Sequence, residues 1–110
     1  MGADYTPTEV AGLIVHGNVQ LIDVRTPHEH EAGRIDGDRL IELVDLPQQA
    51  GTIDPDRPVI FYCRSGGRSA MATQALSEAG FDAHNMTGGM LAWAAAGLPM
   101  VPDGAQVIDP

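Results

Sequence analysis

The chain has 110 residues and a formal charge of −9, from fifteen acidic and six basic side chains. This length is typical of one domain with its own core. Acidic proteins repel phosphate backbones, and outside one loop the sequence has no basic stripe or aromatic platform, so we expect no nucleic-acid partner. No apolar run approaches the roughly 20 residues of a membrane span, and the polar first residues contain no signal-peptide hydrophobic stretch. We therefore expect no membrane partner.

The sequence contains a single cysteine, Cys63. One cysteine excludes an intramolecular disulfide and agrees with a reducing compartment, in which a reactive thiol survives. We therefore expect the protein to be cytoplasmic.

The first half of the chain alternates between helix and strand signals. A helix is expected from Thr6-Pro7 to near Gly17, because Glu9 follows the cap position and apolar residues recur on one face. The apolar run at 21–24 predicts a buried strand. Pro27 opens a short helix that ends near Gly33. A second strand is expected over 40–43, and a weak helix over 45–50.

The second half repeats this alternation. A proline-containing linker at 51–58 leads into the apolar strand 59–62, which delivers Cys63. A helix rich in small residues is expected over 70–80, a short strand over 83–86 and a last helix over 89–96. Short apolar strands that alternate with helices predict an α/β fold, with a parallel sheet covered on both faces.

The loop Cys63-Arg64-Ser65-Gly66-Gly67-Arg68-Ser69 lies at a turn from strand to helix. Its two glycines let the backbone aim successive N–H groups inward, and the helix N-terminus adds partial positive charge. Only roughly 3% of an ordinary cysteine is thiolate at pH 7, so these surroundings predict a nucleophile with a lowered pKa. Two of the six basic side chains, Arg64 and Arg68, predict an anionic substrate. The alternative, an inert core cysteine, requires none of these neighbours.

Three blocks of sequence together resemble the rhodanese family of sulfurtransferases, over roughly residues 5–100. The loop from Cys63 to Ser69 is similar to the family's active-site loop. The other two blocks precede and follow it. They are Leu21-Ile22-Asp23-Val24-Arg25 with Glu29 and Gly33-Arg34-Ile35, and Thr87-Gly88-Gly89-Met90 with Trp93 and Gly97-Leu98-Pro99.

The resemblance implies a single rhodanese domain over residues 1–110, with a core of about 5–100. Pro99 and Pro102 predict a mobile tail at 101–110. The resemblance implies a rhodanese-like α/β fold with a small parallel sheet, and a thiosulfate sulfurtransferase without a metal or other cofactor. Cys63 would attack the sulfane sulfur of thiosulfate or a related anionic donor and become a persulfide. The sulfur would then pass to cyanide, to a thiol or to a protein sulfur acceptor.

The resemblance also implies roles for the neighbours of Cys63. The substrate-binding residues would be Arg64, Ser65, Gly66, Gly67 and Arg68, and the supporting residues Asp23, Arg25 and Ser69. In this interpretation the loop amides stabilise the thiolate and the persulfide, and Arg64 receives the donor's sulfonate oxygens.

Several of these roles have alternatives. Arg68 either contacts the substrate or ties the loop to a buried carboxylate, with Asp23 as the expected partner. For Asp23 and Arg25 we favour a mutual ion pair that positions loops. Ser69 is expected to cap the helix that follows, and Ser65 to hydrogen-bond the donor.

Two other functions remain open. Cysteine phosphatases and arsenate reductases also place a cysteine loop and an arginine at a helix N-terminus, but with five intervening residues where this chain has four between Cys63 and Arg68. The second open function is a sulfur-relay or binding module that acts on a protein partner. The run His28-Glu29-His30-Glu31 could suggest a metal, but a surface helix is the favoured interpretation.

Overall fold

The structure, a computed structural model, describes residues 4–110, so the very start of the chain lies outside the described residues. Four parallel strands form one sheet in the order β2-β1-β3-β4. In the register of this sheet, Asp23 lies opposite Tyr62 on one side and opposite Leu40 on the other. The strands are β1 Gln20–Asp23, β2 Arg39–Leu40, β3 Val59–Tyr62 and β4 Ala83–Asn85.

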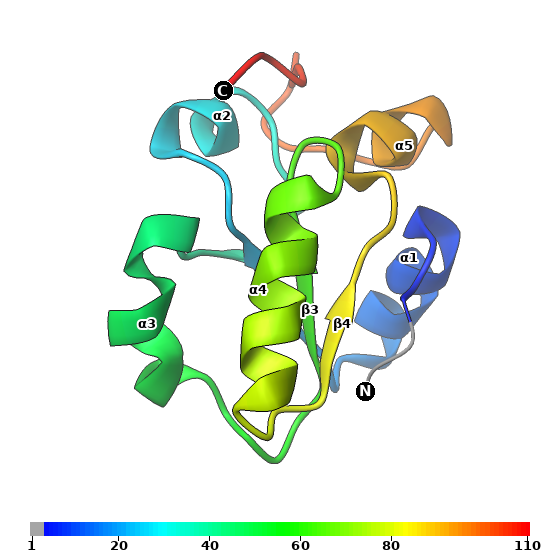
Figure 1. Ribbon diagram of the computed structural model, residues 1–110. Coiled ribbons are helices and arrows are strands. Elements are labelled where there is room, and N and C mark those ends of the chain that lie inside the picture. Colours follow the sequence, from blue (N-terminus) through cyan, green and yellow to red (C-terminus); the bar gives the residue numbers. More distant parts are fainter. Residues whose placement is uncertain (1–3) are drawn as a thin grey trace.

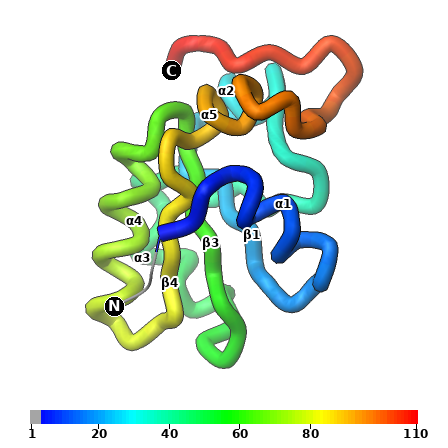
Figure 2. The backbone as a smooth tube through the Cα atoms, turned by 90° about the vertical axis from the view of Figure 1, so that its right-hand side faces the viewer, coloured from blue at the N-terminus to red at the C-terminus, as the bar shows by residue number. Residues whose placement is uncertain are grey.

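Helices cover both faces of the sheet, which confirms the predicted α/β architecture. Figures 1 and 2 show α3 and α4 on one face and α1 and α5 on the other. None of the helices within residues 4–110 is long and apolar enough to cross a bilayer. The helices are α1 Pro7–His16, α2 Pro27–Ala32, α3 Leu46–Gln49, α4 Gly67–Glu78 and α5 Gly89–Ala95, with short 3₁₀ turns η1 Leu43–Asp45 and η2 Ala50–Thr52 on either side of α3.

The strand β3 is apolar throughout because both of its faces are buried. Val59 and Phe61 belong to the core cluster that includes α4, whereas Ile60 and Tyr62 belong to the cluster that includes α1 and α5. All four residues have essentially no exposed surface. The strand that delivers Cys63 is therefore held rigidly from two sides.

The strand expected over 40–43 is shorter than predicted. Its partner β1 ends at Asp23, after which the chain turns into α2. Regular β1–β2 pairing therefore ends with Leu40, opposite Asp23. The N–H of Ile41 still donates to the carbonyl of Asp23 at 3.0 Å, and that of Leu43 to the carbonyl of Val24 at 3.2 Å. Leu43 then begins the 3₁₀ turn η1.

The strand order places a switch point between β1 and β3. From β1 the chain continues to β2 at one edge of the sheet, and from β3 it continues to β4 at the other edge. The loops after β1 and β3 therefore diverge, and such a divergence leaves a crevice beyond the carboxyl ends of the strands. Cys63, directly after β3, lies at this point.

Candidate active site

The Cys63 thiol is enclosed by hydrogen-bond donors from the loop that follows it. Sγ lies 3.1 Å from the N–H nitrogen of Gly66, 3.5 Å from that of Ser69 and 3.4 Å from the Ser69 hydroxyl. The residue is free of any disulfide and only 1% exposed. The predicted nest of inward N–H groups is therefore present around the sulfur.

These donors change the acidity of the thiol. Burial alone raises the pKa of Cys63, but hydrogen bonds from the Ser69 side chain and from the backbone of Ser69, Gly66 and Ser65 lower it below its usual value. The stabilised form is the thiolate, since only the charged sulfur accepts these bonds strongly. The geometry thus suits a nucleophile.

The prediction that Ser69 caps α4 is wrong. The N-cap is Gly66, whose φ of 105° lies in the left-handed region that favours glycine, and no side chain of residues 4–110 caps the helix. Ser69 instead lies inside the first turn, where its hydroxyl reaches both Sγ and the carbonyl of Gly66, the latter at 3.3 Å. The exposed Gly67 begins the helix. A capping side chain is not needed at this position, because free N–H groups of the first turn donate to the Cys63 sulfur instead.

The N-terminus of α5 holds the backbone of the loop from behind. Met90 donates its N–H to the carbonyl of Cys63 at 2.9 Å, and Leu91 donates to that of Arg64 at 3.0 Å. A Cβ on Gly89 would lie 2.5 Å from the Cys63 oxygen. Gly89 is therefore a positioning residue that the local sequence did not reveal, because its contact depends on the fold.

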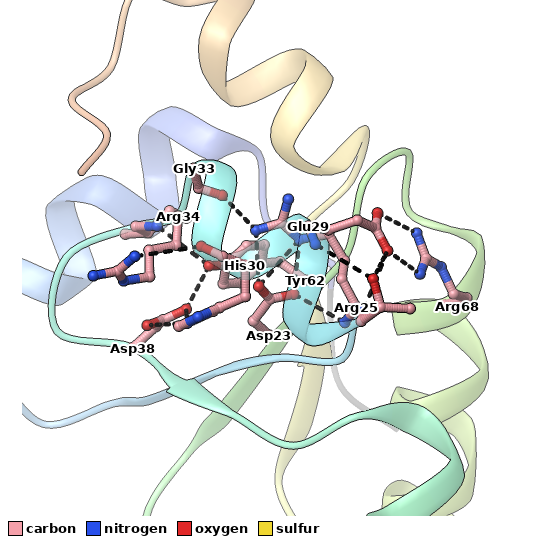
Figure 3. Close-up of polar contacts among 11 residues, drawn as sticks. Asp23, Arg25, Glu29, His30, Gly33, Arg34, Asp38, Tyr62 and Arg68 are labelled. Carbon is pink, nitrogen blue, oxygen red and sulfur yellow. Dashed lines mark hydrogen bonds and ion pairs between the residues drawn. The ribbon is translucent and has the colours of Figure 1, made fainter. Parts of the chain in front are cut away.

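Arg68 ties the loop to a buried carboxylate, but the expected partner was wrong. Its two terminal nitrogens lie 2.7 and 2.9 Å from the two carboxylate oxygens of Glu29. Asp23 instead pairs with Arg25. Figure 3 shows Arg68 reaching from α4 to Glu29 in α2. The Glu29 side chain is fully buried, and its position is set by a capping box in which Thr26 and Glu29 bond each other.

Asp23 and Arg25 form the mutual pair that the sequence predicted. Both side chains are fully buried, and the Arg25 Nη2 atom lies 2.8 Å from the Asp23 carboxylate. The same nitrogen donates to the carbonyl of Gly33 at 2.7 Å. This pair joins the end of β1, where Asp23 lies opposite Tyr62 in the sheet, to the segment after α2.

Next to this pair lies a second polar cluster of Tyr62, Asp38 and His30 (Figure 3). The Tyr62 hydroxyl donates to Asp38 at 2.5 Å, and His30 Nε2 lies 3.1 Å from both Asp38 oxygens. Ligand atoms of Asp23, His30 and Asp38 all lie within 4.8 Å of one another. Because the Arg25 guanidinium already neutralises Asp23, these residues fit an internal polar network better than a cation site.

This cluster also corrects the interpretation of the His28–Glu31 run as a surface helix. Glu29 is fully buried against Arg68, and His30 is partly buried against Asp38. Only His28 and Glu31 of this run are exposed. The helix thus turns two consecutive residues, Glu29 and His30, toward the interior.

Arg64 is the guanidinium nearest to Cys63 along the chain, and its side chain is 30% exposed. Its Nε donates to the carbonyl of Ile108 at 3.2 Å, and its Nη2 lies 3.2 Å from the Asp109 carboxylate. The end of the tail, at Ile108 and Asp109, therefore lies against the loop in the structure. The mobility of residues 101–110 stays a prediction. Neither partner of Arg64 was foreseen from the sequence.

The family comparison explains why these parts occur together. The family described as the rhodanese-like domain matches residues 6–96. The chain is a rhodanese-like domain. The sequence blocks from which this family was predicted thus supply three parts of the structure: the Cys63 loop, the Asp23–Arg25 pair and the Gly88–Gly89 turn.

Individual relatives agree with this assignment. The chain is 40% identical over 89 residues to a sulfurtransferase of Allochromatium vinosum, covering 79% of this chain and 83% of that protein. It is 36% identical over 77 residues to the thiosulfate sulfurtransferase GlpE of Shewanella oneidensis, covering 69% and 76%. It spans 25% of the length of the "Probable adenylyltransferase/sulfurtransferase MoeZ" of Mycobacterium tuberculosis. These rhodanese-family relatives support a sulfurtransferase activity.

The same fold occurs in solved structures. A rhodanese-related protein of Thermoplasma volcanium superposes with a TM-score of 0.85 at 26% sequence identity, over 90% of this chain and 97% of that one. The predicted rhodanese-like fold is confirmed.

Proposed function

We propose that this rhodanese-like domain transfers the sulfane sulfur of thiosulfate through a persulfide on Cys63. The observation that carries the proposal is the set of three donors at 3.1 to 3.5 Å from Sγ. They stabilise negative charge on sulfur, which is needed twice: the thiolate attacks in the first half-reaction and departs in the second.

The two half-reactions balance without a redox partner. The Cys63 thiolate attacks the outer sulfur of thiosulfate, a new S–S bond forms, and sulfite leaves with the electrons of the old bond. Cyanide then attacks the outer sulfur of the persulfide, thiocyanate leaves, and the thiolate returns. A thiol or a protein sulfur acceptor would take the place of cyanide in the same step.

The two arginines of the loop receive different roles in this proposal. Arg68 has both terminal nitrogens on Glu29, so it positions the loop. Among the described residues, the Arg64 side chain is held only by a carbonyl and by a carboxylate that is 90% exposed, so it is the group from which a sulfonate is able to displace a partner. We assign donor binding to Arg64, with the hydroxyl of Ser65 and the backbone of Gly66 and Gly67 beside it.

The same contacts disfavour phosphatase or arsenate reductase chemistry. Such a reaction needs the arginine at the helix start to clasp a tetrahedral oxyanion, but here that arginine, Arg68, is committed to Glu29. Steady hydrolysis of p-nitrophenyl phosphate that is lost in Cys63→Ser would overturn our preference. We place the reaction in the cytoplasm as part of the proposal, because a single reactive thiol needs a reducing compartment.

The test is an intact-mass measurement on the reduced protein before and after thiosulfate, and again after cyanide. We expect a gain of one sulfur atom that cyanide removes as thiocyanate, and no gain in Cys63→Ser. Loss of sulfur to a protein acceptor but not to cyanide would identify a relay module. No gain with thiosulfate would overturn thiosulfate as the donor.

A further inference from the structure

Within residues 4–110, both polar partners of the Arg64 side chain come from the C-terminal tail. Ile108 offers its backbone carbonyl and Asp109 its carboxylate, each at 3.2 Å from a guanidinium nitrogen. Figures 1 and 2 show the tail, in red, running along the edge of the molecule above the start of α4 and beside α2. A segment distant in sequence thus lies on the residue to which we assign the donor's charge.

The tail is fastened firmly before it reaches Arg64. The Trp93 indole N–H donates to the carbonyl of Pro99 at 2.9 Å. Arg34 and Val101 exchange two backbone hydrogen bonds of 2.9 Å, and the Gln106 N–H donates to the carbonyl of Ala32 at 2.9 Å. These bonds hold the tail in place as far as Gln106.

The glycine at the end of α2 makes this path possible. A Cβ on Gly33 would lie 2.6 Å from the carbonyl oxygen of Gln106, so only glycine admits the tail at this distance. Beyond Gln106, Val107 packs against the core cluster that includes α1 and α5. Within the described chain, the only polar partner of residues 107–110 is Arg64.

We propose that residues 106–109 form a strap across Arg64, and that Asp109 is a selectivity residue that competes with anionic donors for this guanidinium. The inference rests on the proposed function, because it concerns the choice of sulfur donor. A donor with a sulfonate must displace the Asp109 carboxylate before it binds Arg64, whereas an uncharged sulfane donor need not. The strap therefore raises the concentration at which thiosulfate saturates the enzyme.

The exposure of the pair indicates the size of this effect. Asp109 is 90% exposed and Arg64 30% exposed, so solvent and salt screen their attraction. An exposed pair of this kind competes only modestly with a donor. We expect Asp109→Asn to lower the KM for thiosulfate about two- to five-fold at low salt, with kcat unchanged.

Asp103→Asn is the matched control for this variant. Asp103 is an exposed aspartate of the same tail, without an ion pair in the described structure, and its substitution changes the net charge equally. A general charge effect would lower the KM in both variants, whereas the strap predicts a lower KM in Asp109→Asn alone. Both variants should use an uncharged organic trisulfide as the unmodified protein does.

A double-mutant cycle locates the effect at Arg64. In Arg64→Ala the KM for thiosulfate should rise, and adding Asp109→Asn to it should bring no further change. If Asp109→Asn lowers the KM equally with and without Arg64, or no more than Asp103→Asn does, the strap proposal is overturned.

A binding measurement keeps this proposal separate from the proposed function. Thiosulfate is titrated into the non-reacting Cys63→Ser variant while the Arg64 Nε–H and the Ile108 and Asp109 amides are followed by NMR. The strap predicts that these signals shift together, and at lower concentration when Asp109→Asn is also present. Absence of a sulfur adduct on the unmodified protein would overturn the proposed function; signals that do not respond to thiosulfate would overturn the strap.

Discussion

Negative charge on the Cys63 sulfur is stabilised by two kinds of hydrogen-bond donor. Backbone N–H groups remain when a side chain is substituted, whereas the Ser69 hydroxyl is removed by substitution. The N–H groups of Gly66 and Ser69 come from the backbone of the loop and of α4. The Ser69 hydroxyl, 3.4 Å from Sγ, is the separable contribution. This allows the side-chain part of the thiolate stabilisation to be measured alone.

Ser69→Ala should raise the pKa of the Cys63 thiol, because a hydrogen bond to the thiolate is lost while burial is unchanged. The midpoint of thiolate absorbance at 240 nm should move to higher pH, and turnover at pH 7 should fall on the order of ten-fold. Ser65→Ala is the control for the absorbance midpoint, because Ser65 contributes its backbone N–H to the thiol and alanine retains that group. The comparison is limited to the midpoint, since we assign the Ser65 hydroxyl to donor binding. An unchanged midpoint in Ser69→Ala would show that the hydroxyl does not support the thiolate.

Among the elements, α5 acts through the approach of its first turn to the active-site loop. Gly89 has a φ of 57°, and a Cβ there would also lie 2.6 Å from the carbonyl carbon and oxygen of Arg64. The glycine thus combines a left-handed backbone with close contact between two main chains. Either requirement alone would favour glycine, and a suitable pair of variants separates them.

Gly89→Ala should lower the free energy of unfolding by about 3 kcal/mol, from backbone strain together with overpacking. Gly97→Ala is the matched variant after the same helix: Gly97 has a φ of 72°, but no atom of the described residues lies within 4 Å of the Cβ that alanine would add. It should cost about 1 kcal/mol, from the left-handed conformation alone. Urea denaturation measures both, and equal losses would contradict a role for the contact with the Cys63 loop.

The features of the fold and the site that were predicted correctly from the sequence are those that neighbouring residues in the chain determine. The strand 59–62 has the expected bounds because its four residues form one continuous apolar run. The nest around Sγ was predictable because glycines, serines and cysteine are neighbours in the chain. The partner of Arg68 was not, because Glu29 is 39 residues away and two buried carboxylates, Asp23 and Glu29, were possible partners. The partners of Arg64 depend on how the tail packs, which no local pattern encodes.

For the molecule as a whole, the Glu29–Arg68 pair joins the helix that follows β1 to the helix that follows β3. It therefore closes the switch point at which the active-site loop lies. Glu29 also accepts bonds from the N–H and the hydroxyl of Thr26, each at 3.1 Å, so its carboxylate is fully used. Burial raises the pKa of Glu29, but the bonds from Arg68 and Thr26 outweigh this and hold it at about 2, against 4.5 for an ordinary glutamate.

A folded-state pKa below the unfolded one means that ionised Glu29 stabilises the fold above about pH 4.5 and loses this effect as the pH falls toward 2. The difference corresponds to about 3 kcal/mol. Glu29→Gln should therefore unfold at lower urea concentration than the unmodified protein at pH 7, and this gap should narrow steadily between pH 4.5 and pH 2. Glu31→Gln, on the exposed side of the same helix, should change stability little at any pH. A gap for Glu29→Gln that stays constant with pH would mean that side-chain packing, not the ion pair with Arg68, joins the two helices.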